Sequence, residues 1–202
     1  GRDIKRYGYN WANLWLINTH NGIRGKLERI HIENYPAVKE HLDQYWDKIS
    51  KRADKGDSPY NLRNCAYLED FSKPKVMWKI IGCNINFSFD ETNKVCNNAV
   101  DIMTGKRNQL LQFVGLMNSK LFEWYLKLTT EAEVQGGGIQ LYVTTLEKTL
   151  LKLDFPNNLN EVTEQRLNGL VSDEDVDKTI YSLYNLTKEE IDFIHFCKQV
   201  NR

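Results

Sequence analysis

The stretch KVMWKII, residues 75–81, decides the fold of this chain of 202 residues. It concentrates β-branched and aromatic side chains, which favour strands. The turn signal FSKP, residues 71–74, comes before it, and the alternating stretch NINFSF, residues 84–89, comes after it. We therefore predict a strand over residues 75–81 and a partner strand over residues 84–89.

The segment after this strand pair predicts the strongest helix of the chain, over residues 106–128. Apolar side chains recur there every three or four residues and fit one buried face. They are Leu110, Phe113 or Val114, Met117, Leu121, Trp124, Tyr125 and Leu128. An earlier helix is predicted to begin at Pro36, which suits the first helical turn, and to end within KRADKGD, where Gly56 is the stop signal.

Shorter elements are expected around these. Residues 11–18 and 27–32 predict a pair of strands with the turn signal HNG between them. CAY at residues 65–67 favours a further strand. The remaining strand candidates are residues 95–100, 139–144 and 150–155.

After Pro156 two or three short helices are expected, because SDED and TKEE both have capping-box spacing. Strands and helices are segregated into runs, which is typical of an α+β fold. We predict a mixed or antiparallel sheet with two long helices and a small C-terminal helical tail. The predicted domains are residues 1–156 and residues 157–202.

The composition is that of an ordinary water-soluble fold, with 41% apolar and 27% charged residues. No apolar run approaches the roughly 18 residues of a membrane-spanning helix, and the polar start GRDIKR lacks the apolar core of a signal peptide. The four cysteines form no CxxC pair, which favours reduced thiols. We therefore expect a cytoplasmic protein with no membrane partner.

The net charge is zero, but it is unevenly distributed. Residues 1–79 carry fifteen Lys and Arg against ten Asp and Glu, whereas residues 157–202 carry five against nine. The basic excess favours an anionic partner for the amino-terminal part of the chain. An ordinary solvated surface with chance clustering is the alternative.

No catalytic or metal-binding template fits the sequence. The glycine-rich loops that hold nucleotides, GxGxxG and GxxxxGK[ST], are missing, and so are HExxH and GxSxG. Asp90, Glu91 and Lys94 have the acid and lysine combination of a metal-dependent nuclease, but they lie in a predicted turn. We therefore expect a binding domain with no catalytic residues and no metal ligands, and a nuclease domain is the alternative.

Several separated motifs resemble those of one known family. They occur in the order GRDIKRY, YPAVKEHLDQY, KRADKGDSPYNLRNCAY, KPKVMWKII, TGKRNQLLQFVGLMNSKLFEWY and GGGIQLY. Together they resemble the TaqI-like specificity domain, the target-recognition domain at the carboxyl end of type IIG restriction-modification enzymes and related adenine methyltransferases. The segment DEDVDKTIYSLYNLTKEEIDFI resembles the short helical segment that closes such proteins.

The resemblance implies a fold like the DNA methylase specificity domain and sequence-specific recognition of double-stranded DNA. It also implies an upstream methyltransferase domain in the same polypeptide, which binds S-adenosylmethionine and methylates adenine at N6. That domain carries an Asn-Pro-Pro-aromatic motif, which the four separate prolines here do not form. The chain is then non-catalytic and has no cofactor of its own, and Mg²⁺ is needed only if the parent enzyme also cuts DNA. A separate specificity subunit that acts through other partners is the alternative.

Residue chemistry selects the candidate contacts with DNA. Arginine pairs with guanine and asparagine or glutamine pairs with adenine, while lysine and arginine neutralise phosphates. The base-reading candidates in predicted loops are Asn18, Asn21, Arg24, Asn61, Arg63, Asn64, Gln135 and Gln140. The candidate phosphate contacts are Lys51, Arg52, Lys55, Lys73 and Lys75.

The stretch DSPYNLRNCAY, residues 57–67, combines these residue types most densely, and we predict that it is a reading loop followed by a strand. Its residues also have structural alternatives. Asn61 and Asn64 can satisfy the backbone of a turn, and Arg63 can pair with an acid at residues 69–70. Elsewhere we expect ion pairs within the domain for Arg2, Asp3 and Arg6, and core positions for Trp78 and Trp124.

Overall fold

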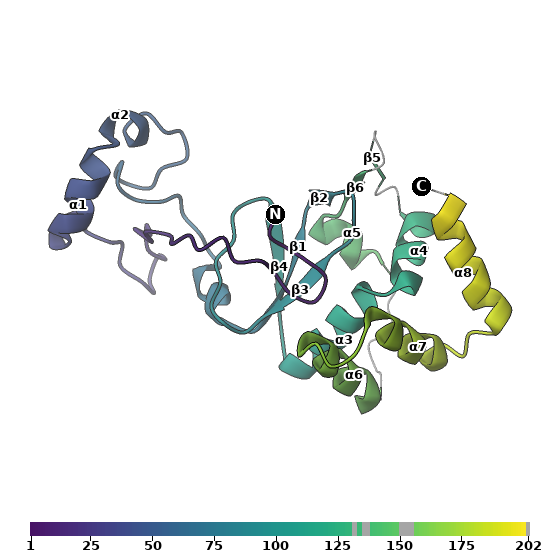
Figure 1. Ribbon diagram of the computed structural model, residues 1–202. Helices are drawn as coiled ribbons and strands as arrows, with labels where there is room; N and C mark the ends of the chain where they lie inside the picture. Colours follow the sequence, from purple (N-terminus) through teal and green to yellow (C-terminus); the bar gives the residue numbers. More distant parts are fainter. Residues whose placement is uncertain (131–132, 135–137, 150–155, 201–202) are drawn as a thin grey trace. The chain divides into compact units, whose positions relative to one another are not determined.

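The computed structural model describes residues 1–130, 133–134, 138–149 and 156–200 (Figure 1). The chain forms two compact units. Unit 1 consists of Gly1–Ala12 and Asp70–Arg202, and unit 2 is the intervening Asn13–Glu69. Unit 2 is therefore an insertion in unit 1, to which the chain connects it at both ends.

A three-stranded antiparallel sheet lies in the centre of unit 1. Its order is β3-β1-β4, with β1 at Lys75–Lys79, β3 at Phe87–Asp90 and β4 at Val100–Thr104. Val76 of β1 lies opposite Phe89 on one side and Met103 on the other. Successive side chains point to opposite faces of a sheet, so the burial of Val76, Met77 and Trp78 shows that both faces are covered. The predicted strand pair is confirmed, although β1 ends two residues early and β3 begins three residues later than predicted.

A second, smaller antiparallel sheet has the order β2-β6-β5. Its strands are β2 at Ile81–Gly82, β5 at Glu133–Val134 and β6 at Gly138–Gln140. The strand predicted at residues 139–144 is thus shorter than expected, because the helix α5, Val143–Glu147, begins inside it. The strand predicted at residues 95–100 is displaced, since β4 begins only at Val100. The strand predicted at residues 150–155 lies outside the described residues.

The long helix predicted over residues 106–128 is two helices. They are α3 at Arg107–Met117 and α4 at Lys120–Thr129. They are separated at Asn118, whose buried side chain accepts from the backbone N–H of Phe87 at 3.0 Å and donates to the Phe87 carbonyl at 2.7 Å. Ser119 then caps α4 by accepting from the backbone N–H of Phe122 at 3.1 Å. Both helices contribute to one core, so the apolar pattern continues across the break and conceals it.

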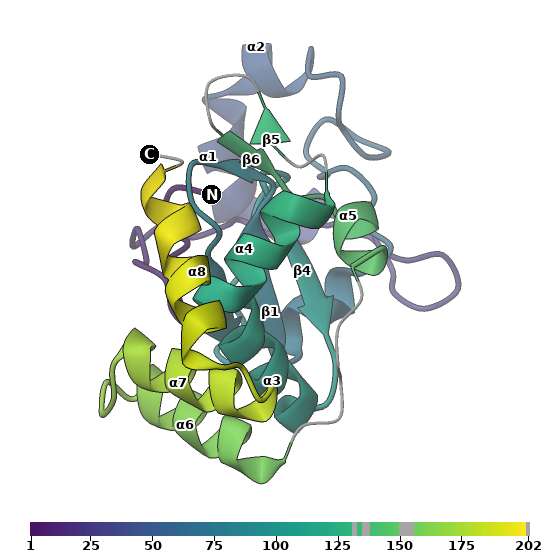
Figure 2. The same ribbon diagram turned by 90° about the vertical axis from the view of Figure 1, so that its right-hand side faces the viewer.

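The helices predicted after Pro156 are present. They are α6 at Asn157–Leu167, α7 at Asp173–Leu183 and α8 at Lys188–Val200. Both predicted capping boxes are confirmed, between Ser172 and Asp175 at the start of α7 and between Thr187 and Glu190 at the start of α8. α6 packs against α3 and α7, and α8 lies alongside α4 (Figure 2). Among the helices that the structure describes, none is long and apolar enough to cross a membrane.

The core of unit 1 joins the sheet to these helices. Gly115 in α3 allows α6 to approach closely, because a Cβ at this position would collide with the hydroxyl of Thr163. Leu159 of α6 and Ile180 of α7 belong to the same buried cluster as Val76 of the sheet. The α+β class with a C-terminal helical region is confirmed, whereas the domain boundary between residues 156 and 157 stays a prediction.

The sequence predicts core positions for two tryptophans. Trp78 is buried, and its indole Nε1 donates to the carbonyl of Leu141 at 3.0 Å. Trp124 of α4 is half-buried and packs edge-on against Phe193 of α8, with the ring centroids 6.4 Å apart. The first prediction is confirmed, and the second is confirmed in part.

The first residues of the chain add to the edge of the sheet. Tyr7 donates its backbone N–H to the carbonyl of Phe87 at 2.8 Å and accepts from the N–H of Phe89 at 3.3 Å. The adjacent Arg6 forms an ion pair with Asp173 of α7 at 3.0 Å. The ion-pair role predicted for Arg6 is therefore confirmed, and it ties the beginning of the chain to its C-terminal helices.

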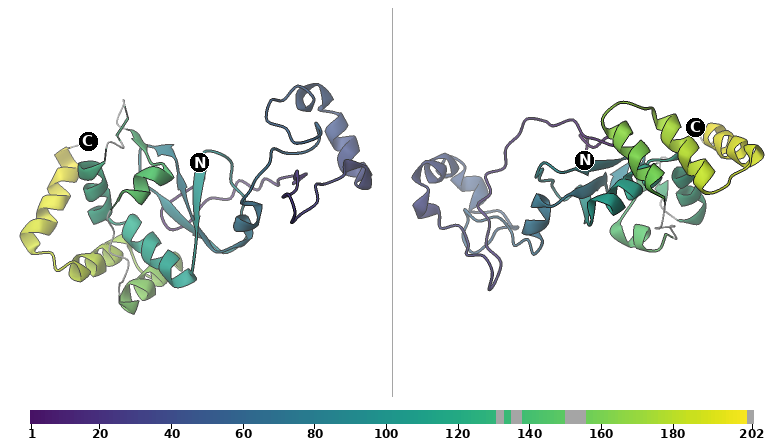
Figure 3. Two further views of the ribbon diagram at one scale, coloured as in Figure 1. Left: turned by 180° about the vertical axis from the view of Figure 1, so that it is seen from behind. Right: turned by 90° about the horizontal axis from the view of Figure 1, so that it is seen from below.

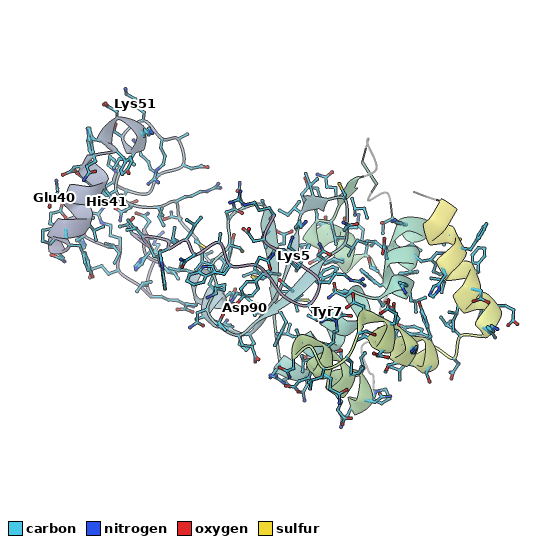
Figure 4. All side chains as sticks on the ribbon, in the orientation of Figure 1. Lys5, Tyr7, Glu40, His41, Lys51 and Asp90 are labelled. Carbon is cyan, nitrogen blue, oxygen red and sulfur yellow. The ribbon has the colours of Figure 1, made fainter. Side chains whose placement is uncertain are left out.

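A buried ion pair joins the start of β1 to the end of β3. The side chains of Lys75 and Asp90 are both fully buried, and Lys75 Nζ donates to Asp90 Oδ2 at 2.6 Å. The ammonium also donates to the carbonyl of Phe71 at 2.7 Å. The carboxylate accepts from the hydroxyls of Tyr9 at 2.8 Å and Thr92 at 2.7 Å. Both charges are therefore compensated within unit 1, where Figure 4 labels Asp90.

Unit 2, in purple and blue in Figure 3, consists of short helices and long loops. Its helices are a 3-10 turn at Ile32–Asn34, α1 at Pro36–Asp43 and α2 at Trp46–Ile49. The helix predicted from Pro36 starts as expected. It ends well before Gly56, because the backbone N–H of Tyr45 turns back to the carbonyl of Leu42 at 2.9 Å and closes a 3-10 turn.

The strands predicted at residues 11–18, 27–32 and 65–67 are wrong. Within unit 2, which the structure describes throughout, β pairing is confined to the isolated bridges Ile23↔Leu27 and Lys55↔Leu62. The backbone groups of these segments bond elsewhere; the Ile30 carbonyl, for example, accepts from the side chain of Asn61 at 2.9 Å. An alternating pattern produces a strand only where another strand is in place to pair with it.

Replacing Lys75 by Met should destabilise unit 1, because it leaves the Asp90 carboxylate buried without its cation. Removing one partner of a buried ion pair costs about 3–5 kcal/mol of the free energy of unfolding. Urea denaturation followed by circular dichroism measures this loss. The control is Lys178→Met on α7, where the side chain is 76% exposed and the unfolding midpoint should stay the same. Equal midpoints for the two variants would contradict the role of the buried pair.

Asp90 also determines how unit 1 responds to acid. Burial opposes ionisation of its carboxyl group, but hydrogen bonds from Lys75, Thr92 and Tyr9 outweigh burial and lower its pKa from 3.8 to about 2. A lowered pKa adds stability above pH 3.8 that is lost as the pH falls towards 2. The loss amounts to about 2 kcal/mol. As the pH is lowered from about 5, the midpoint temperature of thermal unfolding should therefore fall more steeply for the wild type than for Asp90→Asn.

Candidate nucleic-acid interface

An open groove of about 850 Å³ lies in unit 2. Residues 21–29 form the larger part of its lining, and Asp57 with residues 64–66 forms the rest. Asn21, Arg24 and Asn64, all predicted to read bases, therefore line one groove although they come from two loops far apart in the sequence. We call it the unit 2 groove.

The first loop of the unit 2 groove folds into a tight turn. The backbone N–H of Ile23 donates to the Leu27 carbonyl at 2.8 Å, and the N–H of Leu27 donates back to the Ile23 carbonyl at 2.9 Å. Gly25 within this turn has a φ of +76°, which glycine adopts without strain. Arg24 and Lys26 flank it and are exposed. Two cationic side chains are therefore presented on a defined turn.

Asn21 fastens the two loops of the groove to each other. Its amide nitrogen donates to Asn64 Oδ1 at 2.5 Å and to Asp57 Oδ1 at 3.0 Å, and its Oδ1 accepts from the backbone N–H of Asp57 at 2.8 Å. Gly56 is needed beside it, because a Cβ there would collide with the Asn21 side chain. Both amide hydrogens of Asn21 bond within the protein, so Asn21 positions the groove lining, and its base-reading role stays a prediction.

The charges of the groove are mixed. Arg24, Lys26 and Arg29 supply cations, and Glu28 and Asp57 supply carboxylates. Neither Arg24 nor Lys26 forms an ion pair with any residue in the described part of the chain, whereas Arg29 Nη1 lies 3.9 Å from Asp57 Oδ2. The groove therefore offers free cations for phosphates, together with guanidinium and amide groups that suit base edges.

Three of the predicted DNA contacts are engaged inside the protein. Asn61 is 2% exposed, and its amide donates to the carbonyls of Ile30 at 2.9 Å and His20 at 3.3 Å. Arg52 donates to the carbonyl of Asn61 at 2.7 Å. Lys75 is the buried partner of the ion pair in unit 1. Asn61 thus satisfies backbone groups, as its structural alternative predicts, and we leave these three residues out of the proposed interface.

Other predicted contacts of unit 2 are exposed but do not line the groove: Asn18, Lys51, Lys55 and Arg63. Lys55 Nζ donates to the carbonyl of Ser50 at 2.9 Å. Arg63 lies 3.6 Å from Asp54, so the ion pair that it makes is not with the acids at residues 69–70. Lys51 follows α2 and is labelled in Figure 4.

The remaining predicted contacts belong to unit 1. Lys73 Nζ donates to Asp70 at 2.6 Å, and the amide of Gln140 donates to the hydroxyl of Tyr142. Gln135 lies outside the described residues. The DNA-binding roles of Lys73, Gln135 and Gln140 remain predictions.

Sequence reasoning missed four charged residues of the groove lining: Lys26, Glu28, Arg29 and Asp57. For Lys26 the signal was present, because Arg-Gly-Lys places a turn-forming glycine between two cations. For Asp57 it was not, since its place in the lining depends on the contact with Asn21, thirty-six residues earlier.

The residues of the nuclease alternative do not assemble a metal site. Among the described residues, no group of three or more His, Cys, Asp or Glu side chains is placed to hold a metal ion. Asp90 is enclosed by its bonds to Lys75 and its neighbours, and Glu91 accepts from Arg107 at 3.0 Å. Both acids therefore pair with cations within unit 1.

The family described as the TaqI-like C-terminal specificity domain matches residues 1–149. The chain belongs to this family. The match includes all of unit 2 and the central sheet of unit 1, and it ends before α6. A TaqI-like specificity domain has a target-recognition role on DNA in restriction-modification enzymes. No curated protein matches the chain.

In this TaqI-like specificity domain, Asn61 and Asn64 should differ in their effect on stability. Asn61→Ala leaves buried carbonyls without their donor and should cost unit 2 about 1–3 kcal/mol. Asn64→Ala is the matched control, because its side chain is exposed and only accepts from Asn21. Amide hydrogen exchange over residues 13–69 measures both. Equal acceleration of exchange in the two variants would show that Asn61 has no special structural role.

Proposed function

We propose that this specificity domain recognises a sequence in double-stranded DNA through the unit 2 groove. The observation that supports this most directly is the turn carrying Arg24 and Lys26, two exposed cations in a groove that also contains the amide of Asn64. Phosphate contacts position a protein on the duplex, and contacts with base edges select the sequence. The groove has cations for phosphates, and guanidinium and amide groups for base edges.

The roles of the two cations follow from their shapes. The planar guanidinium of Arg24 can donate two parallel hydrogen bonds to guanine O6 and N7. The ammonium of Lys26 is a point charge that suits a phosphate oxygen. Asn64 has its oxygen held by Asn21 at 2.5 Å, which orients its amide nitrogen as a fixed donor.

We further propose that the domain directs an N6-adenine DNA methyltransferase of a type II restriction-modification system. S-adenosylmethionine and the methyl transfer then belong to a methyltransferase domain upstream in the same polypeptide, and Mg²⁺ is required only if that enzyme also cuts DNA. The family match and the order of the motifs support this assignment. A separate specificity subunit is the second possibility, and the upstream coding sequence distinguishes the two. The cytoplasmic location expected from the sequence stays a prediction.

Substitution of the two cations should affect DNA binding differently. Lys26→Ala removes a phosphate contact, so it should weaken binding to all duplexes alike and make the slope of log K against log salt concentration shallower by about 0.9. Arg24→Ala removes a base contact, so it should relax the preference at one position by about 1–3 kcal/mol. Fluorescence anisotropy at several salt concentrations measures the slope. Selection from a pool of randomised duplexes, followed by sequencing, measures the preference.

The control for both measurements is Lys178→Ala, an exposed residue of α7 in unit 1. It should leave both the slope and the selected sequence unchanged. If the wild-type chain selects no sequence and shows no salt-dependent binding, the proposed function is wrong.

A further inference from the structure

Two carboxylates, Glu28 and Asp57, line the unit 2 groove, and Asp57 is the one that Asn21 holds in place. The side chain of Asp57 is 64% exposed, and its position is fixed by Asn21, which bonds both its Oδ1 and its backbone N–H. The nearest cation that pairs with it is Arg29, at the long distance of 3.9 Å from Oδ2. Asp57 therefore presents a positioned carboxylate oxygen that the protein only loosely compensates.

A carboxylate in a DNA-binding groove weakens the binding of DNA in general. It repels phosphates, so it lowers the affinity of non-specific binding. It becomes favourable only when it meets a donor, and in the major groove a carboxylate accepts from the N4 amino group of cytosine. Such a residue exchanges general affinity for discrimination.

We propose that Asp57 is a specificity-determining residue, which accepts a hydrogen bond from a cytosine amino group and disfavours the other bases at that position. This inference rests on the proposed function of the groove. Asn21 is then a positioning residue for two readers together, since its amide nitrogen also binds Asn64 Oδ1 at 2.5 Å. The acceptor Asp57 and the donor Asn64 are held by one side chain.

The surrounding geometry favours a reading role over a purely structural one. An ion pair that stabilised the loop would require close contact, whereas the distance to Arg29 is near the 4 Å limit for exposed ion pairs. The bond from Asn21 uses Oδ1, so the contact of Oδ2 within the protein is the long one to Arg29. Asp54, by contrast, lies nearby in the sequence, does not line the groove and lies 3.6 Å from Arg63.

The test replaces the carboxylate by its isosteric amide, Asp57→Asn, which keeps an oxygen for the bond from Asn21. The matched control is Asp54→Asn, and circular dichroism confirms that both variants fold. Selection from randomised duplexes should show a cytosine preference in the wild type that falls about tenfold in Asp57→Asn and shifts towards adenine, the base that asparagine pairs with. Anisotropy on a non-selected duplex should show stronger binding, because one negative charge is removed from the groove.

Asp57→Ser removes the charge without supplying an amide, and it should lose the cytosine preference without the shift to adenine. Asp54→Asn should keep the wild-type sequence. If both Asp57 variants select the wild-type sequence and only unfold at a lower temperature, Asp57 is structural and this inference is wrong while the proposed function stands. If the wild type itself selects no sequence, the proposed function is wrong and the inference with it.

Discussion

The ion pair between Lys75 and Asp90 fixes the strand register on which unit 1 depends. The two residues lie opposite each other in the β1–β3 ladder, so a slip by one residue would separate two buried charges. A buried ion pair adds little net stability, but leaving either charge uncompensated is costly, and this penalty excludes other registers. The same pair bonds to Tyr9 and Phe71, which lie just before and just after the insertion of unit 2. It therefore also holds together the two parts of unit 1.

The elements that could be predicted from the sequence are those whose signal is local. KVMWKII forms a strand because its own side chains favour one, and SDED and TKEE form capping boxes within four residues. The break between α3 and α4 was not predicted, although Asn118 and Ser119 are residues that compete for backbone hydrogen bonds. Their effect depends on Phe87 being within reach, and that is a consequence of the tertiary fold. The missing strands of unit 2 have the same origin, because a strand requires a partner.

In the unit 2 groove, too, the sequence alone does not separate residues of the same type that have different roles. DSPYNLRNCAY contains Asn61 and Asn64 three positions apart, and their chemistry is identical. One is buried and bonds to the backbone of the first loop, while the other is exposed at the groove. The stretch is thus both the structural anchor and part of the candidate reading surface. Composition predicted that the stretch is important, and only the burial of each side chain separates the two roles.

The insertion of unit 2 has a consequence for how the domain can change over evolution. The 57 residues of Asn13–Glu69 leave unit 1 and return to it, so for unit 1 they are a closed loop. Tyr9 and Phe71 lie at the two ends of this loop, and both bond to the Lys75–Asp90 pair. Closing a flexible loop of this length costs about 3.6 kcal/mol of chain entropy, and the cost rises only with the logarithm of the length. A loop twice as long would add about 0.6 kcal/mol. Residues can therefore be gained, lost or exchanged between these two ends at a small cost in free energy, so the insertion can diverge while the sheet and helices of unit 1 stay the same.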